Sequence, residues 1–209
     1  MKKLYIYLLL ILLASISVYV FQQIVVTDTL LSDHLSQQLS FNRIEQLLEF
    51  RDKWSWVNYA ILPIIYLLKF TFISLWILSG IILFGYKTSF KKIFQVVLVA
   101  EFVWIVPSLL TIIWFGLIDT DYTLVDVQYF QPLSLMNFFD GELVESWLVF
   151  PLKALNLFEV AYMLVLAIGI KKVINRDYNT SLGFVVPVYG LGLVTWIVFI
   201  TFLSINLSA

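Results

Sequence analysis

Five long apolar runs constrain this chain more than any other feature of its sequence. They cover approximately residues 4–26, 59–85, 94–117, 148–170 and 183–203. A helix needs roughly 20 mostly apolar residues to cross a bilayer, where the backbone must satisfy its own hydrogen bonds. The composition agrees, because 13% of the residues are charged, whereas soluble domains contain about 25%. We therefore expect an all-α, polytopic membrane protein with five transmembrane helices, forming a single membrane domain over residues 1–209.

Basic residues gather on one side of these runs. Eight of the 13 lysines and arginines lie before the first run, between the second and third, or after the fourth: Lys2, Lys3, Lys87, Lys91, Lys92, Lys171, Lys172 and Arg176. Because cytoplasmic loops are enriched in basic residues, we expect a cytoplasmic N-terminus and a C-terminus outside. The first run continues to Val26, which favours an uncleaved anchor over a signal peptide. The acidic, aromatic-rich segment 118–147 is expected to fold back onto the outer interface.

The residue types that the sequence lacks exclude several kinds of chemistry. Without cysteine there are no disulfides or iron–sulfur clusters, and the single histidine, His34, excludes a three-histidine zinc site. No Walker A, GxGxxG or HExxH motif is present. A net charge of −1 argues against nucleic acid as a partner. We therefore expect no cofactor, no metal site and no catalytic residues, and hence a protein that is not an enzyme.

The polar segment between the first two runs contains an amphipathic pattern. Asn42 followed three residues later by Glu45 is typical of a helix start, and apolar residues then recur on one face. We expect a short amphipathic helix on the outer side, either a linker on the membrane surface or a helix that docks a partner. The candidate docking residues are Ile44, Leu47, Leu48 and Arg51.

Three ionisable residues lie inside the predicted spans, Lys69, Glu101 and Glu159, with Asn156 one turn before Glu159. A charge at such depth costs several kcal/mol unless it is paired or hydrated. At about 1.5 Å per residue, Lys69 and Glu159 both lie about 15 Å from the outer ends of their helices. We therefore expect Lys69 to pair with Glu159, although a tilted second helix would let Lys69 reach Glu101. The cluster is a structural ion pair, a proton or ion relay, or a polar substrate site.

The second half of the chain carries a family resemblance. A basic turn and a span are followed by a long outer segment, by the run Leu155-Asn156-Leu157-Phe158-Glu159, and by a last span over Gly183–Leu203. In this layout the stretch Lys87–Phe202 resembles the integral membrane domain of the Yip (Ypt-interacting protein) family, in its bacterial branch. The resemblance implies five spans, a cytosolic N-terminus and a membrane scaffold without a defined reaction. It supplies no catalytic residue.

These observations favour one function and leave one alternative. We expect a non-enzymatic integral membrane scaffold or accessory subunit of a transport, envelope or trafficking system. Its expected location is the bacterial cytoplasmic (inner) membrane, where its partners are the lipid bilayer and other membrane or envelope proteins. The alternative is a small ion- or proton-coupled transporter subunit that uses the buried Lys69, Glu101 and Glu159.

Overall fold

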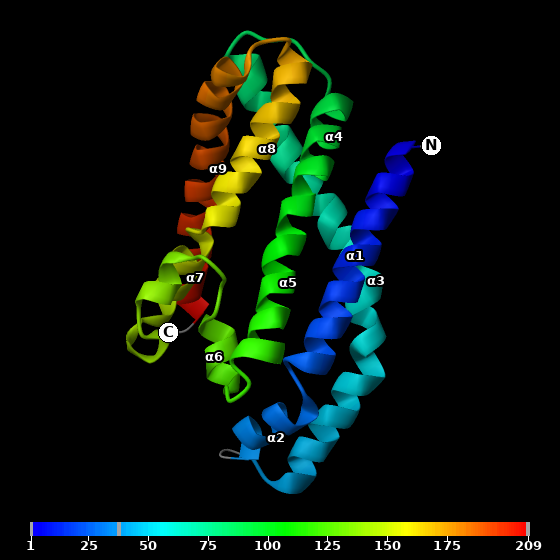
Figure 1. The fold of residues 1–209 in the computed structure, drawn as a ribbon, viewed down its shortest axis with the longest axis vertical. Helices are drawn as coiled ribbons and strands as arrows, with labels where there is room; N and C mark the ends of the chain where they lie inside the picture. The colour runs from blue at the N-terminus through cyan, green and yellow to red at the C-terminus, as the bar shows by residue number, and fades with distance from the viewer. Residues whose placement is uncertain (1, 37–38, 208–209) are drawn as a thin grey trace.

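The computed structural model describes residues 2–36 and 39–207, and all the elements named in these ranges are helical. In chain order they are α1 (Lys2–Ile24), α2 (Asp28–Ser36), α3 (Phe41–Leu83), α4 (Phe90–Ala100), the 3₁₀-helix η1 (Glu101–Trp104), α5 (Ile105–Ile113), the π-helix η2 (Trp114–Ile118), α6 (Leu124–Tyr129), the 3₁₀-helices η3 (Leu135–Phe138) and η4 (Gly141–Leu143), α7 (Ser146–Ala154), α8 (Leu157–Ile174) and α9 (Tyr178–Leu207). Figure 1 shows α1, α3, α4–α5, α8 and α9 running along the long axis of the molecule. The prediction of an all-α fold is confirmed.

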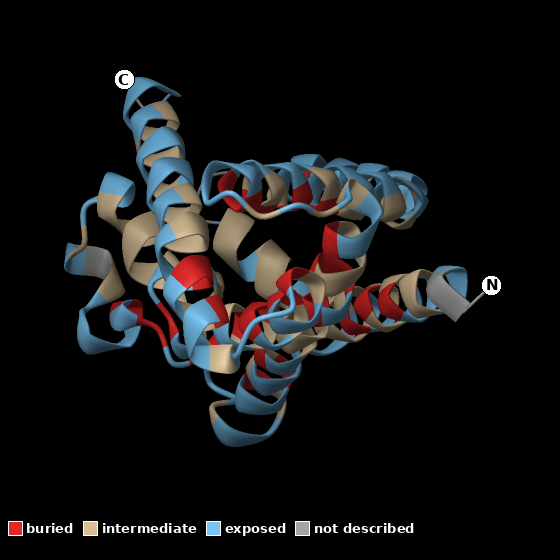
Figure 2. Ribbon diagram, turned by 90° about the horizontal axis from the view of Figure 1, so that it is seen from above, coloured by how far each residue is buried: buried red, intermediate tan, exposed pale blue. Residues whose placement is uncertain are grey.

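Four segments are long and apolar enough to cross a membrane, and they are Leu4–Ile24, Phe41–Leu83, Phe90–Ile118 and Tyr178–Leu207. Most of their residues are not buried inside the protein, and Figure 2 shows exposed surface along the outward faces of the long helices. Many of the exposed side chains are large and apolar, among them Leu68, Phe72 and Leu191. Such a surface requires lipid as its solvent. The chain is a multi-pass membrane protein.

The expected fourth span, residues 148–170, is not one helix, and that prediction is wrong. Helix α7 ends at Ala154, and α8 begins at Leu157. Asn156 lies between them with extended backbone, and its side chain accepts hydrogen bonds from the backbone N–H groups of Phe158 and Glu159. A side chain that satisfies the first N–H groups of a helix fixes where that helix starts. Asn156 therefore divides the apolar run into two helices.

The expected short outer helix is also not a separate element. Residues 41–83 form one continuous helix, α3, whose N-cap is Ser40 instead of the expected Asn42. The prediction of two helices is wrong because neither proline nor glycine interrupts residues 41–62, and the proline that follows, Pro63, is accommodated inside the helix. Helix α3 thus extends from the polar segment directly through the second apolar run.

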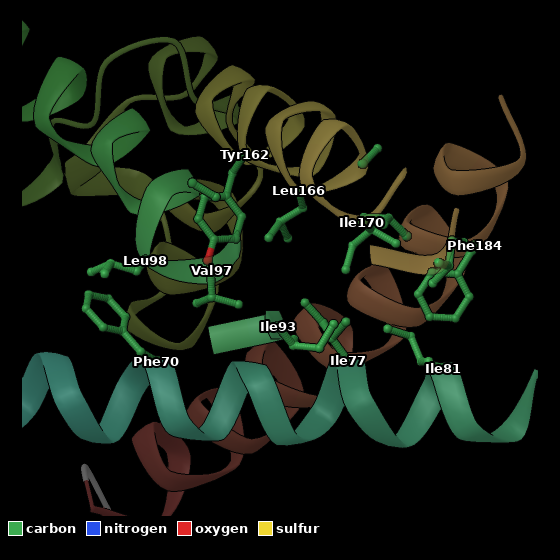
Figure 3. Close-up of a cluster of buried hydrophobic side chains, with 14 of the residues drawn as sticks. Phe70, Ile77, Ile81, Ile93, Val97, Leu98, Tyr162, Leu166, Ile170 and Phe184 are labelled. Atoms are coloured by element: carbon green, nitrogen blue, oxygen red, sulfur yellow. The ribbon is translucent and has the colours of Figure 1, made fainter. Parts of the chain in front are cut away.

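A hydrophobic core joins α3, α4, α8 and α9 (Figure 3). Its fully buried side chains are mostly aliphatic or aromatic: Phe70, Ile77, Ile81, Ile93, Val97, Tyr162, Leu166 and Ile170. Gly169 lets α8 approach α4 closely, because a Cβ atom at this position would come within 2.3 Å of a methyl group of Val96. We name this set of side chains the aliphatic core. It fixes the relative positions of the helices that carry the charged residues.

The two ends of the molecule differ in what they contain. Figure 1 shows the N-terminus at the same end as the α3–α4 and α8–α9 connections. The C-terminal end of α9 lies at the other end, together with α2, α6 and α7. Below, the second end is called the α6–α7 side.

Candidate functional site: a buried charge cluster

The centre of the site is an ion pair between α3 and η1. The ammonium nitrogen Nζ of Lys69 lies 2.5 Å from Oε1 of Glu101. The side chain of Glu101 is 1% exposed, whereas that of Lys69 is 42% exposed. A carboxylate this deeply buried needs a charged partner, and Lys69 provides it.

The expected pairing of Lys69 with Glu159 is therefore wrong. The expectation rested on depth counted along each helix, which ignores how the helices cross and rotate. In the structure α4 and η1 lie between the two, since the core side chains of α4 contact both α3 and α8. The flexible lysine stem reaches the nearer carboxylate, which is that of Glu101.

Two aromatic rings complete the surroundings of the Lys69 ammonium. Its Nζ lies 5.5 Å from the centre of the Trp104 ring and 6.0 Å from that of Tyr66. A cation within about 6 Å of an aromatic face is attracted by the ring. These contacts add to the attraction that the Glu101 carboxylate exerts on the ammonium.

Glu159 takes part in a second polar pair, between α8 and α9. Its Oε2 accepts a hydrogen bond of 2.9 Å from the hydroxyl of Tyr189. Glu159 is the third residue of α8, where a carboxylate is favoured by the helix dipole. The ring of Tyr162 lies 5.2 Å from that of Tyr189 and 6.3 Å from that of Trp104. Aromatic side chains thus connect the two pairs.

We define the charge cluster as Lys69, Glu101, Glu159 and Tyr189. Of the predicted set, Asn156 belongs to it only indirectly, because its amide caps α8 and so positions Glu159. Sequence reasoning missed Tyr189, together with the neighbouring rings of Tyr162 and Trp104. Tyrosines in the middle of apolar runs are a usable signal, since a buried hydroxyl usually has a polar partner.

The helix that carries Glu101 is irregular at that residue. Residues 101–104 form the 3₁₀-helix η1, and Pro107 follows in the first turn of α5. Proline has no N–H to donate to the carbonyl of Val103, four residues before it, and its ring crowds that carbonyl. The helix tightens just before the proline as a result. Glu101 begins this tightened turn.

A cavity of about 330 Å³ adjoins the charge cluster. Glu101, Tyr66 and Trp104 line one part of it, and residues of α6 and α7 line another. Of the two carboxylate oxygens of Glu101, Oε1 is held by Lys69, and Oε2 has no hydrogen-bond partner among the described residues. Tyr162 likewise has a buried hydroxyl that is unpaired within the described part of the chain.

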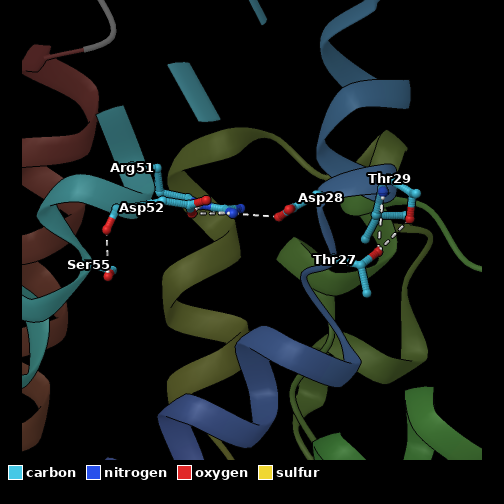
Figure 4. A network of polar contacts seen from close by, with 7 residues as sticks. Thr27, Asp28, Thr29, Arg51, Asp52 and Ser55 are labelled. Carbon is cyan, nitrogen blue, oxygen red and sulfur yellow. Dashed lines mark hydrogen bonds and ion pairs between the residues drawn. The ribbon is translucent and has the colours of Figure 1, made fainter. Parts of the chain in front are cut away.

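The candidate docking residues lie at the start of α3, and two of them contact the chain itself. Ile44 is buried where α3 packs against α2, and Arg51 lies 2.5 Å from Asp28 and 2.8 Å from Asp52 (Figure 4). Leu48 is half-buried, and Leu47 is 38% exposed. Exposed ion pairs contribute about 0.2–1 kcal/mol, so Arg51 ties α2 to α3 only weakly. Leu47 is the most exposed apolar residue of the four.

Within residues 2–36 and 39–207, no three His, Asp or Glu side chains gather in a way that would hold a metal ion. Comparisons with protein-family models, curated proteins and solved structures find no match for this chain. The resemblance to the Yip family therefore stays a prediction.

Proposed function

We propose that the chain crosses the membrane five times, with its N-terminus in the cytoplasm and its C-terminus outside. The four long apolar segments supply four crossings. Helix α8 supplies the fifth together with the apolar α7 before it: residues 157–170, which precede Lys171, extend about 21 Å at 1.5 Å per residue, against the roughly 30 Å of the hydrocarbon layer. The termini lie at opposite ends of the molecule (Figure 1), as an odd number of crossings requires. The basic connections give the orientation.

We further propose that the protein is a non-enzymatic scaffold or accessory subunit in a bacterial cytoplasmic membrane. One observation carries this proposal: each polar pair of the charge cluster joins two different helices, Lys69–Glu101 joining α3 to η1 and Glu159–Tyr189 joining α8 to α9. Polar contacts between membrane helices add only about 1 kcal/mol each, but they determine which helix faces meet. A bundle held in this way presents a fixed surface to partners. The bacterial membrane rests on the resemblance to the Yip family.

The proposal is tested by purifying the full chain in a mild detergent and measuring the masses of intact complexes. We expect a membrane or envelope protein to co-purify in a fixed ratio. The same ratio is expected for the double variant Lys69→Leu/Glu101→Leu, because the pair serves packing in this proposal. A protein that is recovered alone, or only as copies of itself, contradicts it.

A second set of variants locates the contact. Leu47→Glu places a charge on the exposed apolar position at the start of α3 and should release the partner. Leu143→Glu is the matched control, since Leu143 is also apolar, is 83% exposed and lies in η4 on the α6–α7 side. Equal release by both variants would exclude α3 as the specific docking site.

A further inference from the structure

The cavity beside the charge cluster lies between one face of α1 and one face of the α5 helix. The α1 residues that line it are Leu10, Ala14, Ser17, Val18 and Phe21, and those of η1 and α5 are Glu101, Trp104, Ile105, Ser108 and Thr111. Both sets recur every three or four residues, as residues on one helical face do. Ala14 and Ser17 are small, and they leave the space between the two helices unfilled.

The walls of this cavity suit water. An apolar cavity of this kind stays dry, whereas a polar one holds water when it offers two or more hydrogen-bonding groups per molecule. At about 30 Å³ per water molecule, a volume of about 330 Å³ holds several. The hydroxyls of Ser108 and Thr111 already donate to the backbone carbonyls of Trp104 and Pro107, so toward the cavity they can only accept. Water molecules in the cavity can donate hydrogen bonds to these two hydroxyl oxygens.

The cavity joins two different environments. At one end lies Glu101, buried and with Oε2 unpaired among the described residues. At the other end lie Val127 of α6, Phe130 and Gln131 directly after α6, and Lys153 of α7. Ionisable residues inside a membrane protein almost always face a partner or a water-filled space, and they mark the paths of protons and ions. Glu101 has both a partner, Lys69, and such a space.

We propose that this cavity is a water-filled path through which a proton from the α6–α7 side reaches Glu101. A hydronium ion in the cavity gives its proton to the Glu101 carboxyl group and leaves a water molecule behind, so the carboxylate becomes a neutral carboxylic acid. Because Oε2 is buried, the side chain turns toward the cavity to take the proton. Lys69 keeps its charge and remains beside the rings of Trp104 and Tyr66. Protonation removes the negative charge of Glu101 and with it the ion pair between α3 and η1. Loss of the proton restores the pair.

A proton fits this site better than a metal cation. The negative charge of Glu101 is already balanced by Lys69, and a second ammonium, that of Lys153, lies at the far end of the cavity and donates to the carbonyl of Gln128. A metal ion would be attracted only weakly to this neutralised carboxylate and would therefore gain little binding free energy. A proton, in contrast, forms a covalent bond to the oxygen. The titratable and charged groups around Glu101 are Lys69 and Tyr66 on α3, Glu159 and Tyr162 on α8, Tyr189 on α9, Lys153 on α7 and Tyr7 on α1.

The path itself is tested by cysteine accessibility, which needs no background correction because the chain has no cysteine. Ser108→Cys and Thr111→Cys place a thiol in the cavity. Leu109→Cys is the matched control, since Leu109 is the next residue of the same helix and is exposed like Ser108, but does not line the cavity. Phe138→Cys, in η3, reports the α6–α7 side. The full-length variants are treated in sealed membranes with a small, charged, membrane-impermeant thiol reagent.

We expect Ser108→Cys and Thr111→Cys to react from the side on which Phe138→Cys reacts, and Leu109→Cys to stay unreactive. Equal reaction at positions 108 and 109, or reaction only from the opposite side, overturns the path. Because Phe138→Cys defines the side, the result does not depend on which compartment that side faces. It is also independent of whether a partner co-purifies.

Protonation is tested by infrared difference spectroscopy of the full chain in lipid vesicles while the pH is lowered. A carboxylic acid band should appear, should be lost in Glu101→Gln and should persist in Glu159→Gln, whose carboxylate lies outside the cavity lining. A band that is unaffected by Glu101→Gln overturns the proposal. A band that responds to sodium at constant pH also overturns it, in favour of a metal cation.

Discussion

The two halves of the bundle interior are built differently. In the aliphatic core, α4 and α8 meet with Gly169 against Val96 and leave no room for one more methyl group. Between α1 and α5, Ala14 and Ser17 leave a cavity with polar walls. The charge cluster lies where the two halves meet. The comparison teaches that one half holds the helices in register while the other leaves a space beside a buried carboxylate.

The largest expected effect comes from separating the two members of the ion pair. Lys69→Leu leaves Glu101 buried without its partner and should lower the free energy of unfolding by about 3–5 kcal/mol. Glu101→Leu should cost less, because the half-exposed Lys69 side chain can extend toward the membrane surface. The double variant should recover much of the loss. Unfolding in mixed detergent micelles measures all three, with Lys92→Leu, an exposed lysine in the first turn of α4, as the control.

The penalty of Lys69→Leu should depend on pH. It should shrink as the pH is lowered, since a buried Glu101 without its partner can then become neutral. A penalty that does not change with pH would mean that Glu101 keeps the same protonation state in the folded variant over the pH range measured.

The same substitution in the two halves should have different costs. Ala167→Leu enlarges a fully buried residue of the aliphatic core and should destabilise the protein by about 1–3 kcal/mol, because the surrounding atoms must move. Ala14→Leu points into the cavity and should change stability by less than about 1 kcal/mol. It should, however, block the reaction of Ser108→Cys with the thiol reagent. Equal costs in thermal unfolding would show that the cavity is as tightly packed as the core.

A smaller effect is expected at the break between α7 and α8. Asn156→Ala removes the acceptor for the N–H groups of Phe158 and Glu159 and should cost about 1 kcal/mol. Asn156→Asp keeps the acceptor and should cost less. Thermal unfolding compares the two. If both variants cost the same, the amide donors of Asn156 to the carbonyls of Lys153 and Ala154 matter more than the cap.

The smallest effect is a pH dependence at the other end of α8, in the connection to α9. Asp177 accepts hydrogen bonds from the hydroxyl and the backbone N–H of Thr180, and these bonds lower the pKa of its carboxyl below the usual value. A lowered pKa in the folded state stabilises the protein above the unfolded pKa of about 4 and is lost as the pH falls through the folded value. Asp177→Asn should therefore flatten the stability profile below about pH 4. Faster amide exchange of Thr180 at low pH in the native protein, absent from the variant, would report the same loss.

The sequence predicted the helical membrane fold well, because apolar runs of span length have few other solutions. It also contained the break at residue 156: Asn156 followed three residues later by Glu159 is the same helix-start pattern that was used at Asn42 and Glu45. At Asn156 the continuous hydrophobicity of residues 148–170 favours a single span over a helix start, whereas the structure follows the helix-start pattern. At Asn42 the start was correct to within two residues, since α3 begins at Phe41.

The partner of Lys69 was not predictable from depth alone. Which carboxylate it meets depends on the rotation of α3 and on the packing of α4 and η1 against it, and both are set by side chains distributed over four helices. The cavity escaped prediction for the same reason. No sequence pattern distinguishes Ser108 and Thr111. They line a cavity only because α5 packs with this face toward the small residues Ala14 and Ser17 of α1.

The short connection after α8 bears on how the chain is assembled. Only residues 175–177 separate α8 from α9, and the carboxylate of Glu159 on the first helix has its partner, the hydroxyl of Tyr189, on the second. A translocating α8 that left the protein-conducting channel alone would carry an unpaired charge into lipid. Insertion of the two helices together, as a hairpin, avoids that state. The last 50 or so residues of the chain are thus expected to leave the channel as one unit, and a ribosome stalled before α9 is complete should leave α8 still retained.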